Sequence, residues 1–420
     1  MKRSTKIWVA VVIAIVLVTA AVTTVLLLNR EQPVRNKKVI LVIVDGIPAD
    51  VIENATVPNM RKLGAYKRSY TGGEISGYSQ TPTISAPGYM NVITGTWGNK
   101  HNVYDNSVDN PNYNYWNIFR LLKEQQPDRK IGIYSTWLDN RVKLIGEGLP
   151  MAGNITFDYK FDGYELDTIQ YPHDAESLYI KLIDERVVNE TATSIANDAP
   201  DLSWVYLQYT DDMGHMYGDS TEFYQSVADA DLLIEQIVES VDHRIENWNE
   251  DWLVIITTDH GRSPETGYGH GGQSERERTT WIFTNLEQTN SYFDNYVPAA
   301  VDIFPTMARF MDIEIPTELL RELDGVPLMD KVSLAQPSLT LSENLLHITW
   351  KAIDNAGDVI VWLSLTNSFQ DGTADDYQHI ATVPVGSQQT TINITNHPSQ
   401  FFKVVLEGQY NTVNKFIFIT

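Results

Sequence analysis

A continuous run of aliphatic and β-branched residues at 38–44 constrains the fold of this chain most strongly. A strand with one face in water alternates polar and apolar residues, whereas a run without alternation is typical of a strand buried on both faces. Such a strand belongs in a parallel sheet that helices cover on both sides. Further strands are predicted at residues 130–134, 203–209, 252–257 and 279–283.

Helical patterns lie between these runs, at residues 114–125, 175–196, 221–245 and 301–310. Strands that alternate with helices of this length indicate repeated βα units. The sequence therefore predicts an α/β domain over residues 38–332. Its core is expected to be an open, mostly parallel sheet with helices on both faces.

The pattern changes after residue 332. Short alternating runs separated by Asn, Asp, Gly and Pro occupy residues 338–349, 359–364, 379–383, 390–394, 401–406 and 415–419. This spacing is typical of a small β-sandwich of immunoglobulin or fibronectin type. We therefore expect a separate C-terminal domain over residues 333–420, which could bind glycan, pack on the preceding domain or act as a spacer.

The N-terminus has the pattern of a membrane segment. Lys2, Arg3 and Lys6 precede an apolar run at residues 7–28, which is long enough to cross the ~30 Å hydrocarbon core of a bilayer. This core is longer than that of a typical cleaved signal peptide. We expect residues 1–37 to form a cytoplasmic tip, an uncleaved transmembrane signal anchor and a linker. The rest of the chain would then lie outside the cytoplasm, and it would be secreted if the segment were cleaved.

Composition excludes several kinds of function. The chain has no cysteine, so a metal can be held only by histidine and oxygen ligands. The formal net charge is −23, which disfavours binding to nucleic-acid polymers because that binding depends on neutralising phosphates. A metal site in this chain must therefore be built from histidine, carboxylate and hydroxyl groups.

Several acids and histidines follow the predicted strands directly or lie in nearby glycine-rich loops. Because the carboxyl ends of parallel strands meet at one edge of a sheet, these side chains are expected to come together. Carboxylate and imidazole ligands suit zinc, and less well manganese. One acid at a strand end is also a common turn or helix cap, so the prediction rests on the whole set. The candidate ligands are Asp45, Asp211, His215, Asp259, His260 and His270.

Ser85 is a candidate nucleophile. Pro87 favours the first turn of a helix, which places Ser85 at or next to the N-cap, beside free backbone N–H groups and the positive end of the helix dipole. Taken alone, this pattern is more often that of a simple capping serine. The same geometry also suits a nucleophile whose transition state carries negative charge.

The order of these motifs resembles the alkaline phosphatase superfamily, and within it the type I phosphodiesterase and nucleotide pyrophosphatase family. The resemblance covers residues 38–330, and Leu-Asp-Gly-Val-Pro-Leu at 323–328 resembles the segment that closes that domain. The motifs are Val-Asp-Gly at 44–46, Ser-Ala-Pro at 85–87, Thr-Gly at 94–95, His-Asn-Val-Tyr-Asp-Asn at 101–106, Asp-Asp-Met-Gly-His at 211–215, Thr-Asp-His-Gly at 258–261 and Gly-His-Gly at 269–271.

The resemblance implies a hydrolase with two zinc ions, or manganese in their place, acting on a small phosphodiester or nucleotide pyrophosphate. Ser85 would form a covalent intermediate, and Asn106 and the backbone N–H after Ser85 would donate to phosphoryl oxygens. The family usually has Thr at this position, and Thr83 is the alternative nucleophile. The resemblance places Asp45, Ser85, Asp259 and His260 around one zinc, and Asp211, His215 and His270 around the other.

Three other functions remain open on sequence grounds. A sulfatase would have Arg where this chain has Tyr89. An alkaline phosphomonoesterase would need a further cation for the terminal phosphate, and Arg262 or Lys100 could supply it or be solvated. An inactive membrane-anchored binding or scaffold protein would be free to lose a metal ligand, yet every ligand position is retained.

A diester would instead need an apolar or aromatic pocket for its second substituent. The candidates for this pocket are aromatic side chains near the motifs, although each could equally pack in the core or at the rim. They are Tyr89, Trp97, Tyr104 and Tyr268.

Overall fold

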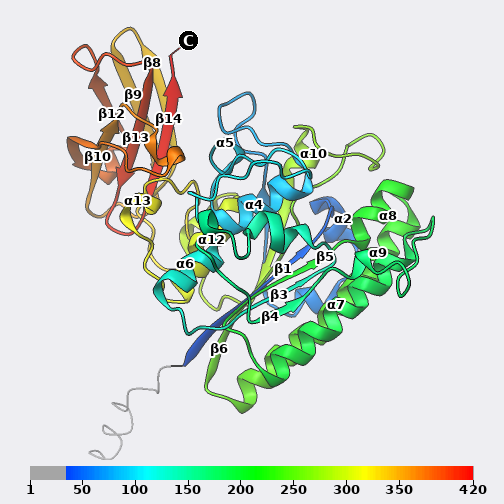
Figure 1. Ribbon diagram of the computed structural model, residues 1–420. Helices are drawn as coiled ribbons and strands as arrows, with labels where there is room; N and C mark the ends of the chain where they lie inside the picture. Colours follow the sequence, from blue (N-terminus) through cyan, green and yellow to red (C-terminus); the bar gives the residue numbers. More distant parts are fainter. Residues whose placement is uncertain (1–34, 420) are drawn as a thin grey trace, which may run out of the picture.

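The computed structural model describes residues 35–419, and a seven-stranded sheet lies at the centre of its larger domain (Figure 1). The strand order is β2-β7-β6-β1-β5-β3-β4. Strand β7 pairs antiparallel with both of its neighbours, β2 and β6, and all the other pairs are parallel. The predicted mostly parallel α/β sheet is confirmed. The strands are β1 (Asn36–Val44), β2 (Ala65–Tyr70), β3 (Ile131–Ser135), β4 (Tyr159–Phe161), β5 (Leu202–Leu207), β6 (Glu250–Thr257) and β7 (Thr279–Thr284).

Helices cover both faces of this sheet. The long helices α7 and α9 pack on one face, and α4, α6 and α12 lie on the other (Figure 1). The helices are α2 (Ala49–Asn54), α3 (Pro58–Arg61), α4 (Ser85–Thr94), α5 (Gly98–His101), α6 (Ile118–Gln125), α7 (Leu178–Asn197), α8 (Tyr209–Tyr217), α9 (Thr221–Asn247), α10 (Glu275–Arg278), α11 (Ser291–Asn295), α12 (Ile303–Phe310) and α13 (Thr317–Leu320).

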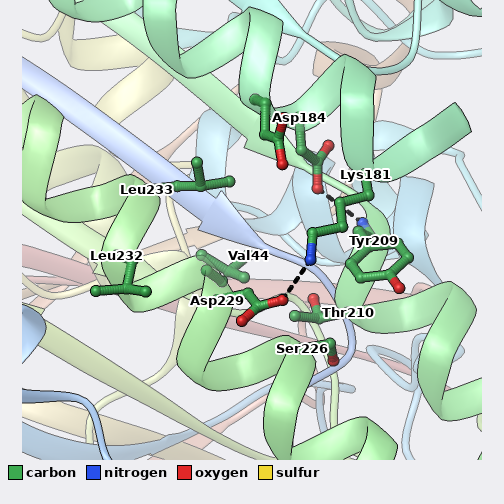
Figure 2. A pocket seen from close by; sticks show the side chains of 11 residues that line it. Val44, Lys181, Asp184, Tyr209, Thr210, Ser226, Asp229, Leu232 and Leu233 are labelled. Atoms are coloured by element: carbon green, nitrogen blue, oxygen red, sulfur yellow. Dashed lines mark hydrogen bonds and ion pairs between the residues drawn. The ribbon is translucent and has the colours of Figure 1, made fainter. Parts of the chain in front are cut away.

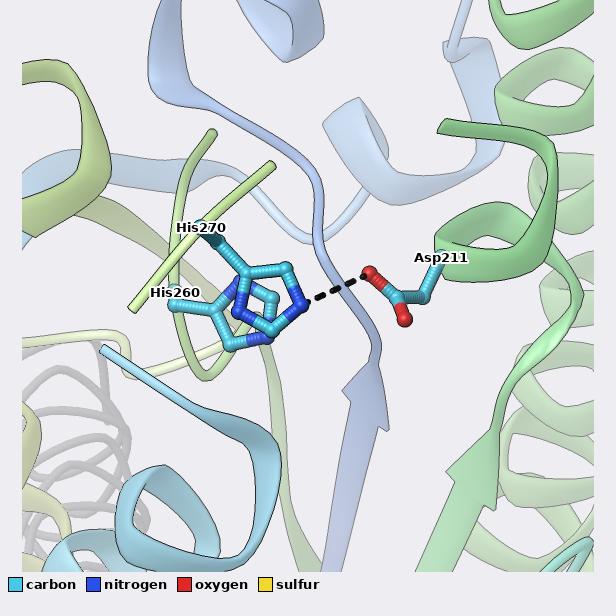
Figure 3. Close-up of side chains that lie close together, drawn as sticks. All are labelled: Asp211, His260 and His270. Atoms are coloured by element: carbon cyan, nitrogen blue, oxygen red, sulfur yellow. Dashed lines mark ion pairs between the residues drawn. The ribbon is translucent and has the colours of Figure 1, made fainter. Parts of the chain in front are cut away.

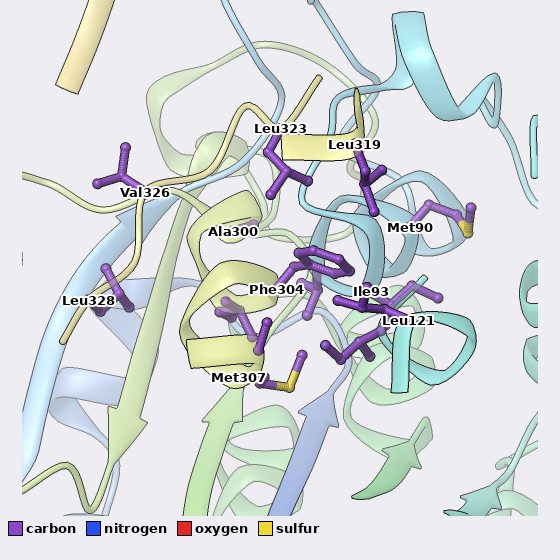
Figure 4. Packing of buried hydrophobic residues seen from close by; sticks show 14 of the residues in the cluster. Met90, Ile93, Leu121, Ala300, Phe304, Met307, Leu319, Leu323, Val326 and Leu328 are labelled. Carbon is purple, nitrogen blue, oxygen red and sulfur yellow. The ribbon is translucent and has the colours of Figure 1, made fainter. Parts of the chain in front are cut away.

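Strand β1 has two buried faces, as its sequence predicts. Successive side chains of a strand point to opposite sides, so its residues divide between two cores. Val39, Leu41 and Ile43 pack with α4, α6 and α12, whereas the alternate residues pack with α7 and α9. Figure 4 shows the first of these cores, where Phe304 of α12 lies against Ile93 of α4.

The smaller domain consists of two antiparallel sheets. Their strand orders are β11-β10-β13-β14 and β12-β9-β8. The predicted run at 338–349 is in fact the hairpin of β8 and β9; the immunoglobulin or fibronectin type stays a prediction. The strands are β8 (Leu334–Ser342), β9 (Leu345–Ala352), β10 (Asp358–Ser364), β11 (Gln378–Pro384), β12 (Gln389–Asn393), β13 (Phe401–Glu407) and β14 (Thr412–Phe418).

The predicted transmembrane segment at residues 7–28 lies outside the described residues. Within residues 35–419, none of the helices is both long enough and apolar enough to cross a bilayer.

Candidate metal centre and nucleophile

The acidic and histidine side chains converge at the carboxyl edge of the sheet because β1 pairs in parallel with β5 and β6. Val44, the last residue of β1, is level with Leu207 of β5, and Ile43 is level with Thr257 of β6. The residues that follow these strands are therefore neighbours, although they are far apart in sequence.

Asp45, Asp259 and His260 form the first candidate metal site. Nε2 of His260 lies 3.4 Å from Oδ1 of Asp45 and 3.2 Å from Oδ2 of Asp259. All three atoms are buried and have no hydrogen-bond partner among residues 35–419. Nδ1 of His260 donates to the carbonyl of Gly261, which leaves a lone pair on Nε2. Two carboxylate oxygens and a ring nitrogen around one point fit a divalent cation.

Asp211, His260 and His270 form the second candidate site (Figure 3). Nε2 of His270 lies 3.9 Å from Oδ1 of Asp211 and 3.0 Å from Nε2 of His215. Nδ1 of His270 donates to the carbonyl of Thr83, so its Nε2 carries the lone pair that a metal would use in place of the contact with His215. The rings of His260 and His270 stack with centroids 3.8 Å apart. His260 thus lies beside both sites, whereas the family resemblance assigned it to only one of them.

The electrostatics of this edge favour cations. Burial raises the pKa of Asp45 to about 7, and the nearby charge of Asp211 acts in the same direction. Burial also raises the pKa of Asp259. Burial lowers the pKa values of His260 and His270 to about 4, so both rings are neutral near pH 7, which is the form that binds metal. Among residues 35–419, Asp45 and Asp259 have only the neutral His260 as an ion-pair partner, and divalent cations would supply the missing positive charge.

Ser85 is the first residue of α4, one position after the N-cap, and is buried. The first turn of α4 packs closely on the metal edge, since a Cβ on Gly88 would come within 2.8 Å of Cβ of Asp259. Thr83, the alternative nucleophile, has its hydroxyl held between the carbonyl of Gly272, 2.9 Å away, and the N–H of Gly271, 3.0 Å away. Ser85 therefore fits the role of nucleophile better.

Asn106 reaches back to the same helix. Its Oδ1 accepts a hydrogen bond from the N–H of Ala86 at 2.9 Å, so this N–H is already bonded and is not open to a phosphoryl oxygen as the resemblance implied. The bond leaves the side-chain N–H₂ of Asn106 as the available donor. Asn106 thus lies beside the first turn of α4, next to Ser85, and its role toward a phosphoryl oxygen stays a prediction.

Residues 39–276 match the sequence profile described as type I phosphodiesterase / nucleotide pyrophosphatase. The chain belongs to this family. The description of this family names enzymes that cleave phosphodiester and pyrophosphate bonds.

Other relatives of this chain are distant. GPI ethanolamine phosphate transferase 3 of Eremothecium gossypii is 24% identical over 203 residues, which are 42% of this chain but only 19% of that protein. The lipoteichoic acid synthase LtaP of Listeria monocytogenes aligns at 15% identity and a TM-score of 0.44, over 67% of this chain and 73% of that one. Human ectonucleotide pyrophosphatase / phosphodiesterase 5 aligns at 14% identity and a TM-score of 0.47, over 67% of this chain and 96% of that one.

Two tyrosines beneath the first site were not identified from the sequence as partners of a metal ligand, although Tyr89 was considered for a substrate pocket. The hydroxyls of Tyr89 and Tyr206 both donate to Oδ2 of Asp45, the latter at 2.7 Å. They fix the carboxylate so that Oδ1 faces Asp259 and His260. Tyr89 follows Ser85 by one turn of α4, which is the only sequence signal for its position. It is part of the core, and not of a substrate pocket.

Arg262 and Lys100, considered as phosphate-binding or solvated cations, are buried and fully engaged. Arg262 donates to Oδ1 of Asp211 at 2.5 Å and to two loop carbonyls. Lys100 donates to Asp324 at 2.6 Å and to Asn414 at 2.9 Å. Neither is free to bind a terminal phosphate.

The glycines of two motifs make room for this arginine. A Cβ on Gly46 would lie 2.7 Å from Nη1 of Arg262, and one on Gly214 would lie 2.4 Å from its Cζ. Gly46 also has φ of +68°, which disfavours other residues. The remaining aromatic candidates divide: Trp97 is buried, whereas Tyr104 and Tyr268 are exposed.

Proposed function

We propose that this enzyme hydrolyses small phosphodiesters or nucleotide pyrophosphates at a two-zinc centre, with Ser85 as its nucleophile. The observation that carries the proposal is the set of three buried, unpartnered atoms on Asp45, Asp259 and His260. Divalent cations held there and beside Asp211 would lower the pKa of a hydroxyl group and stabilise charge on phosphoryl oxygens. Zinc suits the donor set best, and manganese is the alternative.

The residues of this chain would act in two steps. Oγ of Ser85 attacks phosphorus and loses its proton; an O–P bond forms as the bond to the leaving oxygen breaks, which gives a phosphorylated serine. Water then attacks the same phosphorus and releases Ser85. The side-chain N–H₂ of Asn106 and the N-terminal end of α4 would stabilise the negative charge.

Diesters are preferred over monoesters in this proposal because a dianionic terminal phosphate would need a further cation. Arg262 and Lys100 are committed to Asp211 and Asp324, so neither is available. A sulfatase is disfavoured because Tyr89 stands where those enzymes have Arg and its hydroxyl binds Asp45. A transferase remains the second candidate, since the curated relative is named as one; an acceptor alcohol would then replace water.

We also propose the domain boundaries and location inferred from the sequence. These are a catalytic domain at 38–332 and a β domain at 333–420. The change from the mixed sheet to antiparallel sheets along the chain supports this division. The basic residues before the apolar run at 7–28 support an anchor that leaves the catalytic domain outside the cytoplasm. Fusion of a reporter enzyme to the C-terminus would test this location.

The test of function uses the purified full-length chain with p-nitrophenyl phosphate, bis-p-nitrophenyl phosphate, a nucleoside-5′-monophosphate p-nitrophenyl ester and p-nitrophenyl sulfate. We expect turnover of the diesters above the monoester, sulfate last, and loss of activity in EDTA. Ser85→Ala should abolish turnover, and elemental analysis should give close to two zinc ions per chain. Full activity of Ser85→Ala, or the opposite substrate order, would contradict the proposal.

A further inference from the structure

We propose that the C-terminal β domain, residues 333–420, positions the two loops that flank the candidate nucleophile, so that turnover depends on this domain. The nucleophile loop, residues 71–84, leads directly into Ser85. The asparagine loop, residues 102–117, carries Asn106. The inference rests on the proposed roles of these two residues, although its structural part can be tested without them.

The nucleophile loop is held by β14. The ring of Tyr78 lies 5.0 Å from that of Phe416 and 4.8 Å from that of Phe418, measured between centroids. Nζ of Lys415, on the same strand, pairs with Glu74. On its other side the loop is bonded to the segment that carries His270, because the side chain of Gln273 donates to the carbonyl of Thr81 at 2.8 Å.

The asparagine loop is held by the turn at 368–372 of the β domain. Nδ2 atoms of Asn112 and Asn114 both donate to the backbone carbonyl of Gln370, at 2.9 and 3.0 Å. The ring of Tyr115 packs on Phe369 with centroids 5.1 Å apart. The asparagine loop is bonded to the first turn of α4, into which the nucleophile loop leads, because the N–H of Ala86 donates to Asn106; a shift of either loop would therefore change the position of the Asn106 amide relative to Ser85.

A buried group of charges fixes the β domain in place. Lys100 lies on α5, between the two loops in sequence, and donates to Asn414 of β14. Lys403 of β13 donates to Glu322 at 2.6 Å and to Asp375 at 2.7 Å, and the side chains of all three are at most 1% exposed. A sliding motion between the domains would separate Lys403 from Glu322 and Lys100 from Asn414, and would leave these buried charges short of partners.

These contacts make Tyr78, Asn112 and Asn114 positioning residues. None of them belongs to the candidate metal sites, and Tyr78 is half exposed, so its replacement does not open a cavity in the core. Loss of a contact should therefore loosen a loop without removing a metal ligand. We expect a loosened loop to lower kcat more than it changes KM, because it disturbs the alignment of Ser85 and Asn106 in the transition state.

The experiment compares the full-length chain with Tyr78→Ala and with Asn112→Ala/Asn114→Ala. The matched controls are Tyr78→Phe, which keeps the ring, and Asn247→Ala, an exposed asparagine at the end of α9. The measurements are kcat and KM for bis-p-nitrophenyl phosphate, zinc content, and amide hydrogen exchange. We expect kcat to fall at least tenfold in both variants, with KM within threefold and zinc unchanged. Exchange should rise at residues 72–84 in the first variant and at 102–117 in the second.

Controls should match the unmodified chain. Unchanged kcat, or unchanged exchange in both loops, would overturn the inference. If the unmodified chain turns over no phosphoester, the proposed function fails instead, and the exchange data alone then decide whether the β domain holds the loops. If Tyr78→Ala does not fold, Glu74→Gln removes the exposed ion pair to Lys415 and gives the same loop readout.

Discussion

At the scale of single residues, Arg262 connects separate parts of the site. It joins Asp211, on α8, to the carbonyls of Gly267 and Tyr268, in the loop that leads to His270. Because its guanidinium occupies Oδ1 of Asp211, it directs Oδ2 toward His215, 3.2 Å away. The planar fork of arginine makes three such bonds at once, which lysine cannot reproduce in the same geometry.

We expect Arg262→Gln to weaken zinc binding and to destabilise the fold. Loss of one partner of a buried ion pair costs about 3–5 kcal/mol, and loss of a group that orients a metal ligand weakens metal binding about 10–100-fold. Urea unfolding and zinc titration measure the two effects. Arg186→Gln, at an exposed ion pair on α7, serves as the control. Unchanged zinc affinity in Arg262→Gln would show that Asp211 needs no support from it.

His101 predicts a specific dependence of stability on pH. Its Nδ1 accepts from the N–H of Val103 and its Nε2 faces Oδ1 of Asn91, so the neutral ring satisfies both neighbours. Burial lowers its pKa from 6.5 to about 3. Because the unfolded state then binds the proton more tightly, the stability that this group contributes is complete above pH 6.5 and is lost as the pH falls toward 3.

When the pH falls from 7 to 5, the protonation of His101 in the unfolded state should lower the free energy of unfolding by about 2 kcal/mol. In His101→Gln the loss over the same interval should be smaller by that amount, measured by urea unfolding at both pH values. His243→Gln, which changes an exposed histidine on α9, should behave as the unmodified chain does. Equal losses in all three proteins would contradict the assignment.

At the scale of elements, α8 depends on a carboxylate from another helix (Figure 2). Asp184 of α7 accepts the backbone N–H groups of Gln208 and Tyr209, at 3.1 and 2.9 Å, and so caps the start of α8. It lines a cavity of about 220 Å³ in which Lys181 pairs with Asp229 at 2.6 Å. Since α8 carries Asp211, this cap also fixes a candidate metal ligand.

Asp184→Ala should destabilise the protein by about 2–6 kcal/mol, because the backbone N–H groups of Gln208 and Tyr209 lose their acceptor and each such loss costs about 1–3 kcal/mol. Thermal or urea unfolding measures the change. Glu185→Ala alters the next residue, which is exposed, and should stay within about 0.5 kcal/mol of the unmodified chain. Similar stability of the two variants would mean that water replaces the cap.

The elements that the sequence predicted best are those with the strongest apolar pattern. The run at 38–44 became β1, buried on both faces, and the metal ligands follow the strands as expected. The edge strands β2 and β4 were missed because β2 mixes polar and aromatic residues and β4 has only three residues. The predicted strand at 203–209 ends at Leu207, since Tyr209 already begins α8.

Within the site, sequence reasoning could find ligand types but not their shared geometry. His260 follows β6, which explains its contact with Asp259 next to it, but its closeness to Asp211 depends on how α8 packs. Tyr89 and Tyr206 carry the ordinary pattern of core aromatics, so nothing local marks them as partners of Asp45. The burial of Arg262 is a tertiary property of the same kind.

At the scale of the whole molecule, stability should depend on metal. In the first site, two buried carboxylates lie together, and three atoms of the site have no hydrogen-bond partner among residues 35–419. A bound cation would supply the missing counter-charge. Zinc at about 100 times its Kd should add about 2.7 kcal/mol and raise the unfolding midpoint of EDTA-treated protein by several degrees. Calcium at the same concentration is the control, because it prefers six to eight oxygen ligands. An unchanged midpoint with zinc would contradict both candidate sites.

The buried charges between the two domains have a consequence for how the molecule unfolds. Lys100 belongs to the α/β domain by sequence, yet one of its acceptors, Asn414, is on the last strand of the β domain; Lys403 reaches the other way to Glu322. If either domain opened alone, both ammonium groups would lose acceptors that water would have to replace. The architecture changes at residue 332, but we expect the parts of the chain before and after it to unfold together. Calorimetry should therefore record a single unfolding transition.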